Sequence, residues 1–201
     1  MTEHHNSDPV LISVNAYSND PTGYRDKYQH HRLELPARFN ELLPLAADVL
    51  DLGCGPGRDL DYFASCGHRV TGVELNPDFV AMCQQNHSVV QVDIRDVQRH
   101  LLPESFDGIW AQASLVHLSV EEVAGVLVDC FDLLRNEGLL YLSVPSDGVS
   151  GWKVEPDGRR WYTVWPDDTI ASPLEAAGFT IFDISHGPYV EAWARAERFL
   201  G

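Results

Sequence analysis

A repeated alternation of short β-forming segments with helical segments constrains this chain's fold more than any other feature of its sequence. Short apolar or β-branched runs predict five strands, at residues 49–52, 68–74, 88–93, 106–112 and 139–144. Helical spacing and capping signals predict the segments between them, at residues 58–66, 76–85 and about 119–134. Strands that alternate with helices in this way form a parallel, doubly wound sheet with helices on both faces.

The chain beyond residue 144 departs from this rhythm. Residues 145–165 are rich in Gly, Pro and Trp and are too long for an ordinary connection, so we expect a functional insertion there. A short helix at about 167–177 precedes two final strands, 178–185 and 189–200, and the tight link between them requires an antiparallel pair. A helix over 190–199 is an alternative, because Ala, Glu and Arg favour helices.

Composition limits the classes of partner and compartment. The 201 residues suit one domain, and the formal net charge of -16 opposes binding to nucleic acid or to anionic membranes. The four cysteines form no C-x-x-C pair, and we expect reduced thiols and no metal site. With no signal peptide and no apolar run of the roughly 20 residues that a membrane span needs, we expect a cytoplasmic protein.

The glycine-rich segment DLGCGPG, residues 51–57, indicates which kind of ligand this sheet would bind. The third glycine of a dinucleotide fingerprint is replaced by Arg58, and Asp51 would repel a pyrophosphate but attract an ammonium group. Glu74 ends the next strand, where a carboxylate can hold ribose hydroxyls, and Asp93 ends the third, where it can accept from an adenine amine. The strand ends therefore predict an amine- and nucleoside-bearing ligand without a phosphate.

Several segments together resemble the class I S-adenosylmethionine-dependent methyltransferases: DLGCGPG (51–57), GVELNP (72–77), VVQVDIRD (89–96), FDGIWAQASLVHL (106–118) and LLRNEGLLYLSV (133–144). The resemblance covers roughly residues 45–200. It implies a Rossmann-like α/β fold in three layers, whose seven-stranded, mostly parallel sheet has an antiparallel last strand, so it favours strands over a helix at 190–199.

The resemblance also implies S-adenosylmethionine as the cofactor, with Asp51 near its methionine amino group and no metal. The expected cofactor contacts are Asp51, Gly53, Cys54, Gly55, Arg58, Glu74, Leu75, Asp93, Ile94, Ala111 and Tyr24. Arg25 is an alternative to Arg58 as the partner of the methionine carboxylate.

For the acceptor side, His117 is the expected general base and His186 a weaker candidate, although either can instead be a packing histidine. Residues 1–44 are expected to form a lid over the main domain at 45–201, and residues 145–165 a wall beside the acceptor. The expected acceptor contacts are Tyr17, Tyr28, Arg159, Trp161 and Tyr162. Arginine beside aromatic rings suits an anionic or aromatic small molecule.

The expected activity is methyl transfer to O, N or S of a small molecule. A non-catalytic regulatory or scaffold protein that binds the same cofactor is the main alternative. A protein methyltransferase and a nicotinamide-dependent oxidoreductase are the others.

Overall fold

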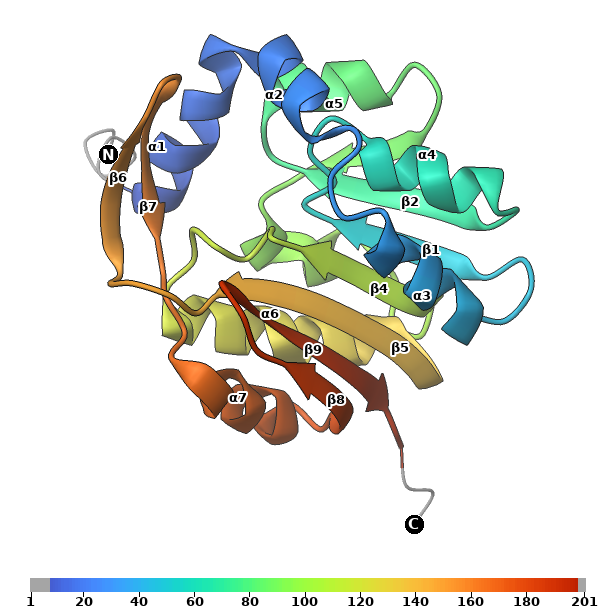
Figure 1. Cartoon of the computed structure of the whole chain (residues 1–201). Coiled ribbons are helices and arrows are strands. Elements are labelled where there is room, and N and C mark those ends of the chain that lie inside the picture. The colour runs from blue at the N-terminus through green and yellow to red at the C-terminus, as the bar shows by residue number, and fades with distance from the viewer. Residues whose placement is uncertain (1–7, 199–201) are drawn as a thin grey trace.

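The structure, a computed structural model, describes residues 8–198 except for the side chains of residues 167 and 168. Its centre is a seven-stranded sheet with the strand order β3-β2-β1-β4-β5-β9-β8 (Figure 1). The strands are β1 (Asp48–Leu52), β2 (Arg69–Glu74), β3 (Ser88–Gln91), β4 (Phe106–Gln112), β5 (Leu134–Pro145), β8 (Thr180–Ser185) and β9 (Tyr189–Ala196). The first five strands are parallel, and β9 runs antiparallel to both of its neighbours.

This arrangement confirms the fold predicted from the sequence and excludes the helical alternative near the C-terminus. β9 pairs with β5 in continuous register from Gly138↔Ala196 to Pro145↔Tyr189. β5 is longer than predicted because it starts at Leu134, directly after α6, and pairs there with Phe106 across an irregularity in β4. The end of the last predicted strand, residues 199–200, lies outside the described residues.

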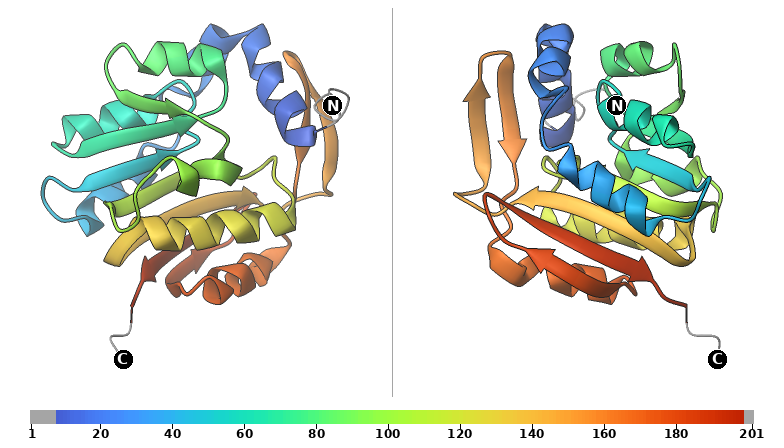
Figure 2. Two further views of the ribbon diagram at one scale, coloured as in Figure 1. Left: turned by 180° about the vertical axis from the view of Figure 1, so that it is seen from behind. Right: turned by 45° about the vertical axis from the view of Figure 1, so that its right-hand side comes forward.

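Helices cover both faces of the sheet (Figure 2). They are α3 (Glu34–Leu42), α4 (Arg58–Ser65), α5 (Pro77–Cys83), α6 (Val120–Leu133) and α7 (Ala171–Ala176), with 3₁₀ turns at Ile94–Arg99 (η3) and Asp167–Ile170 (η4). α3 and α4 pack on an aromatic face in which Trp110 and Tyr141 stack at 4.2 Å between ring centroids. α6 and α7 pack on the aliphatic face, on side chains such as Leu50, Ile109 and Leu140.

Strand order reverses between β1 and β4, so the loops that leave the carboxyl ends of these two strands lead to helices on opposite faces of the sheet. In open α/β sheets this switch point is the usual place for a ligand. Among residues 8–198, none of the helices combines the length and hydropathy that a membrane-spanning segment requires.

The N-terminal segment forms two short helices that the sequence analysis did not predict: α1 (Pro9–Ala16) and α2 (Pro21–Tyr28), joined by η2 (Tyr17–Asn19). Each starts with an Asp-Pro pair. Asp8 and Asp20 accept hydrogen bonds from backbone N–H groups of the first turns, and proline occupies the first helical position. We call residues 9–28 the lid.

The insertion is a β-hairpin, β6 (Gly151–Glu155) and β7 (Gly158–Tyr162), rather than an irregular loop. It stands beside α1, as Figures 1 and 2 both show. Ser13 Oγ accepts from the Trp161 N–H at 2.8 Å, and Asn19 donates to the Asp157 carbonyl at 2.6 Å. The lid and the hairpin therefore form one continuous wall above the carboxyl ends of the strands.

Candidate active site

A cavity of about 700 Å³ lies between the switch point, the lid and the hairpin. This volume is within the range of small-molecule sites. A smaller cavity of about 90 Å³ adjoins it under α1. Tyr17, Tyr24, Gly53, Gly55 and Ala113 line both cavities and mark the passage between them.

Gly53 begins the glycine loop (residues 53–57) and lies close to Ser114, which follows strand β4. Gly53 has φ +75°, and a Cβ at this position would lie 2.5 Å from the Ser114 Cβ. A side chain here would therefore be strained by its backbone conformation and would also collide with Ser114.

Asp51, which lines the larger cavity, is 3% exposed, and its Oδ2 has no hydrogen-bond partner within residues 8–198. Burial raises the pKa of this carboxyl group well above its ordinary value. A buried carboxylate oxygen without a partner is a costly feature, and a cationic group in the cavity would satisfy it. Asp51 is therefore a carboxylate that could face a cationic group, and its expected contact with an ammonium group stays a prediction.

Glu74 holds the glycine loop against the end of β2. Its carboxylate accepts from the backbone N–H groups of Gly55 at 2.9 Å, Leu75 at 2.8 Å and Asn76 at 2.7 Å. Burial nevertheless raises the pKa of this carboxyl group, although the three hydrogen bonds oppose the shift. Glu74 and Leu75 line the smaller cavity, and the expected contact of Glu74 with a ribose stays a prediction.

Asp93 and Ile94 also line the smaller cavity. Asp93 caps η3 by accepting from the Arg95 N–H, and it forms an ion pair with the Arg95 guanidinium at 2.6 Å. The same guanidinium pairs with Asp8 at 2.8 Å and with Glu122 at 2.7 Å. This network, which the sequence analysis missed, joins the start of the lid to α6 and to the smaller cavity.

Arg58 already forms an ion pair and several hydrogen bonds with other residues of the protein. It forms a two-point ion pair with Asp59, donates to the Gln112 Oε1 at 2.5 Å, and donates to the carbonyls of Tyr28 and His31 at 3.3 and 2.7 Å. It therefore fastens the end of the lid to the core. Its expected contact with a methionine carboxylate stays a prediction, as does that of Arg25, which lines the cavity and pairs with Asp26.

His117 joins the lid to the hairpin. Its Nδ1 lies against the Trp161 carbonyl, which can only accept, so Nδ1 carries the proton. Nε2 then accepts from the Tyr17 hydroxyl at 3.0 Å. Burial lowers the pKa of His117 to about 4, so the ring is neutral near pH 7 with its basic nitrogen turned to Tyr17.

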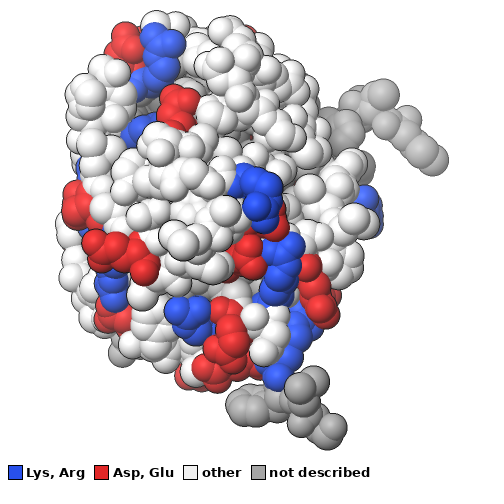
Figure 3. All heavy atoms as spheres, turned by 90° about the vertical axis from the view of Figure 1, so that its right-hand side faces the viewer, with Lys and Arg blue, Asp and Glu red and all other residues white. Residues whose placement is uncertain are grey.

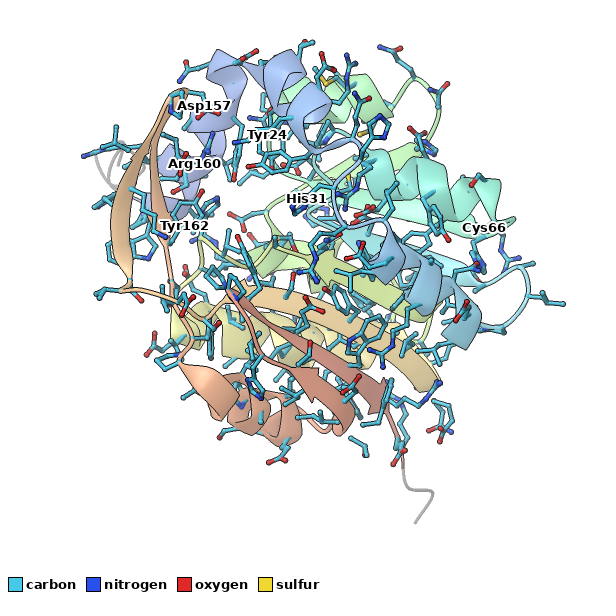
Figure 4. All side chains as sticks on the ribbon, in the orientation of Figure 1. Tyr24, His31, Cys66, Asp157, Arg160 and Tyr162 are labelled. Carbon is cyan, nitrogen blue, oxygen red and sulfur yellow. The ribbon has the colours of Figure 1, made fainter. Side chains whose placement is uncertain are left out.

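Successive side chains of a β-strand point to opposite faces, so only alternate residues of β7 reach the cavity. Arg160 and Tyr162 line it, and Figure 4 shows both extending from β7 toward the space that Tyr24 borders from α2. Arg159 and Trp161 point to the opposite face of the hairpin, where both contact Trp152. The structure therefore places Arg160, and not Arg159 or Trp161, at the cavity wall.

At the end of β4, too, the residues that line the cavities differ from the one that the sequence analysis selected, Ala111. Ala111 is 1% exposed in the hydrophobic core, whereas the next three residues, Gln112, Ala113 and Ser114, line the cavities. Ser114 Oγ is buried without a hydrogen-bond partner among the described residues, which makes Ser114 a site candidate that the sequence analysis did not select. Cys54, Tyr28 and His186 line the larger cavity as expected.

Two further observations bear on possible partners. Within residues 8–198, no group of three His, Cys, Asp or Glu side chains is arranged to hold a metal ion. On the face shown in Figure 3, acidic and basic side chains are interspersed, and no continuous basic surface forms there.

Comparison with known proteins agrees with this geometry. Residues 49–138 match the methyltransferase domain family. The ubiquinone biosynthesis O-methyltransferases of Xanthomonas axonopodis pv. citri and Xanthomonas campestris pv. campestris strain B100 are 30% and 35% identical to the chain over 177 and 171 residues. These alignments cover 78% and 76% of this chain, and 72% and 70% of the two relatives.

A solved structure is similar over almost the whole chain. It is the 1,6-didemethyltoxoflavin-N1-methyltransferase of Burkholderia thailandensis, with 1,6-didemethyltoxoflavin and S-adenosylhomocysteine bound. It is 27% identical with a TM-score of 0.76, and the match covers 98% of this chain and 92% of that one. The chain therefore belongs to the class I S-adenosylmethionine-dependent methyltransferases. It is a methyltransferase that uses S-adenosylmethionine.

Proposed function

We propose that this enzyme transfers a methyl group to an oxygen, nitrogen or sulfur atom of a small molecule. The observation that carries the proposal is the enclosure of the site: the lid and the hairpin cover a cavity of about 700 Å³ at the switch point. The net charge of -16 argues against nucleic acid as the acceptor. The relatives named above are an enzyme of ubiquinone biosynthesis and one bound to 1,6-didemethyltoxoflavin, which is consistent with a small acceptor.

The residues at the switch point fit S-adenosylmethionine, which supplies a methyl group already activated on a sulfonium. Asp51 offers a buried carboxylate oxygen to the ammonium group, and Ser114, next to Gly53, offers a buried hydroxyl group. Gly53 and Gly55 leave the loop backbone accessible to the ligand. On this proposal Glu74 holds the ribose, while the smaller cavity, with Leu75, Asp93 and Ile94, takes the adenine.

The chain's own part in the reaction is to exclude water, orient the acceptor and remove its proton. Tyr17 lines both cavities, whereas His117 lines only the smaller one. We propose that the proton of the acceptor moves to Tyr17 Oη while Tyr17 gives its own proton to His117 Nε2. The Trp161 carbonyl then stabilises the imidazolium through Nδ1–H. His117 remains the base, but it acts through Tyr17.

The test is transfer of labelled methyl from S-adenosylmethionine into a cell extract divided beforehand into metabolites, proteins and nucleic acids. Gly53→Val is the blank, because valine collides with Ser114. Label in the metabolite fraction supports the proposal. Label confined to protein or nucleic acid refutes the small-molecule class, and cofactor binding without label in any fraction favours a non-catalytic role.

A further inference from the structure

Tyrosine is concentrated around the cavity. Five of the chain's seven tyrosines line it: Tyr17, Tyr24, Tyr28, Tyr162 and Tyr189. All five are half-buried, so each ring keeps part of its surface open to the cavity. A site rich in partly covered rings is complementary to a flat apolar ligand, because aromatic pairs add stabilisation beyond burial alone.

Three of these tyrosines belong to the acceptor side. Tyr17 and Tyr24 also border the smaller cavity, whereas Tyr28, Tyr162 and Tyr189 line only the larger one. They come from α2, β7 and β9. All three therefore border one common space, the larger cavity. Burial raises the pKa of Tyr189. The hydroxyl group of a tyrosine can both donate and accept a hydrogen bond.

Each arginine that lines the larger cavity already forms an ion pair with a carboxylate, so none of the four is an unpaired cation. The pairs are Arg25–Asp26, Arg32–Glu191, Arg58–Asp59 and Arg160–Asp157. An anionic acceptor would have to displace one of these carboxylates from its partner, which is costly where the pair is buried. These ion pairs therefore argue against the anionic one of the two ligand classes that arginine beside aromatic rings suggested.

A cationic acceptor is not favoured either. Apart from Asp51, which faces the cofactor ammonium, Glu155 is the only carboxylate lining the larger cavity without an ion pair within residues 8–198. Its charge acts on Lys27, whose pKa it helps to raise. The acceptor side of the cavity is therefore close to electrically neutral.

One buried hydrogen-bond donor at the cavity wall, on Arg160, has no partner among the described residues. Arg160 is 5% exposed and lies over the Tyr17 ring at 3.9 Å, and its Nε–H is buried without a hydrogen-bond partner in the described chain. This N–H can donate to a carbonyl or ring nitrogen of a ligand that lies between the tyrosines.

We infer that the acceptor is a neutral, planar aromatic molecule with a hydrogen-bond acceptor on its ring, held among Tyr28, Tyr162 and Tyr189 and bound by Arg160. The inference rests on the proposed function for its site. It adds the chemical class of the molecule that this site takes.

The test measures binding and needs no methyl transfer. Protein saturated with S-adenosylhomocysteine is titrated calorimetrically with four probes of similar size: 4-hydroxybenzamide, 4-hydroxybenzoate, tyramine and trans-4-hydroxycyclohexanecarboxamide. The neutral aromatic amide should bind at least about tenfold more tightly than the anionic, cationic or non-aromatic probe. Equal or tighter binding of any of these three, or no binding of the aromatic amide, overturns the inference.

Variants connect the binding to the tyrosines. Tyr189→Leu should weaken binding of 4-hydroxybenzamide about tenfold or more, while Tyr189→Phe should keep most of it. Phe182→Leu, on the exposed part of β8, is the matched control and should change nothing. An unchanged affinity for S-adenosylhomocysteine shows that Tyr189→Leu has folded. If that variant binds the amide as the wild type does, the inference fails. Label transfer into metabolites would still test the proposed function separately.

Discussion

Replacing Asp51 by asparagine should stabilise the ligand-free protein and weaken cofactor binding at the same time. The wild-type carboxylate is 3% exposed, and its Oδ2 has no partner within residues 8–198. Leaving such a group unsatisfied costs about 1–3 kcal/mol of folding free energy. For a chain of this size that corresponds to a rise in Tm of roughly 2–12 °C in the variant.

The pH dependence of this gain has a definite sign. Burial raises the pKa of Asp51 above its ordinary value of 3.8, so the folded state favours the protonated group more than the unfolded state does. Below pH 3.8 the carboxyl is protonated in both states and the wild type keeps its full stability. That contribution is lost as pH rises through the folded-state pKa. The advantage of Asp51→Asn should therefore be small in acid and should grow toward neutral pH.

The same substitution, Asp51→Asn, should weaken cofactor binding. Removing one member of a buried ion pair costs about 3–5 kcal/mol, which is a loss of affinity between roughly 10² and 10⁴-fold. The assays are thermal unfolding of the ligand-free protein across pH, and calorimetric titration with S-adenosylmethionine.

Asp59→Asn is the matched control, because Asp59 is also buried at the cavity but pairs with Arg58 and accepts from the Trp110 Nε1 at 2.9 Å. This change should lower Tm. A lower Tm for ligand-free Asp51→Asn would refute the burial argument, and an unchanged affinity would show that Asp51 does not face the ammonium group.

Substitutions of three other side chains, His117, Tyr17 and Arg58, should also have measurable effects. The pKa of His117 falls from 6.5 to about 4 on burial, so stability present above pH 6.5 is lost as pH falls toward 4. His117→Asn should flatten the fall in Tm over that interval, and an unchanged slope would contradict this origin. Tyr17→Phe should lower kcat about 10²- to 10⁴-fold with little change in the Kd of S-adenosylhomocysteine, whereas a parallel loss of affinity would make Tyr17 a binding group. Arg58→Lys keeps the charge beside Asp59 but loses the fork that reaches the lid carbonyls, so amide hydrogen exchange over residues 20–31 should accelerate. Unchanged exchange there would mean that other contacts hold the lid.

The cofactor half of the site was predictable because its residues follow from local sequence. Short strands alternating with helices define the sheet, and a carboxylate that follows a parallel strand lies at the carboxyl edge of the sheet. Asp51, Glu74 and Asp93 are all of this kind, and the structure finds each of them at one of the two cavities. The two lid helices were also predictable from the sequence, because each starts with an Asp-Pro pair, which is a helix-start signal.

The acceptor half was less predictable because it depends on register and on long-range contacts. A shift of one residue in a strand reverses the face of every side chain, so choosing between Arg159 and Arg160 requires the hairpin pairing. The bond between His117 and the Trp161 carbonyl joins residues 44 positions apart, and the Tyr17–His117 bond joins residues 100 apart. No local pattern contains either contact.

These long-range contacts also determine how the enzyme's specificity can change. His117 binds the lid through Tyr17 and the hairpin through Trp161, so the two walls of the acceptor site are held by one neutral ring that belongs to the core. The cofactor contacts proposed at Asp51 and Glu74 do not involve that ring. Substitutions on the inner face of the hairpin, such as at Tyr162, can therefore alter the acceptor while the sheet and the glycine loop stay intact. A new acceptor would require a different set of rings on a hairpin that still presents its Trp161 carbonyl to His117.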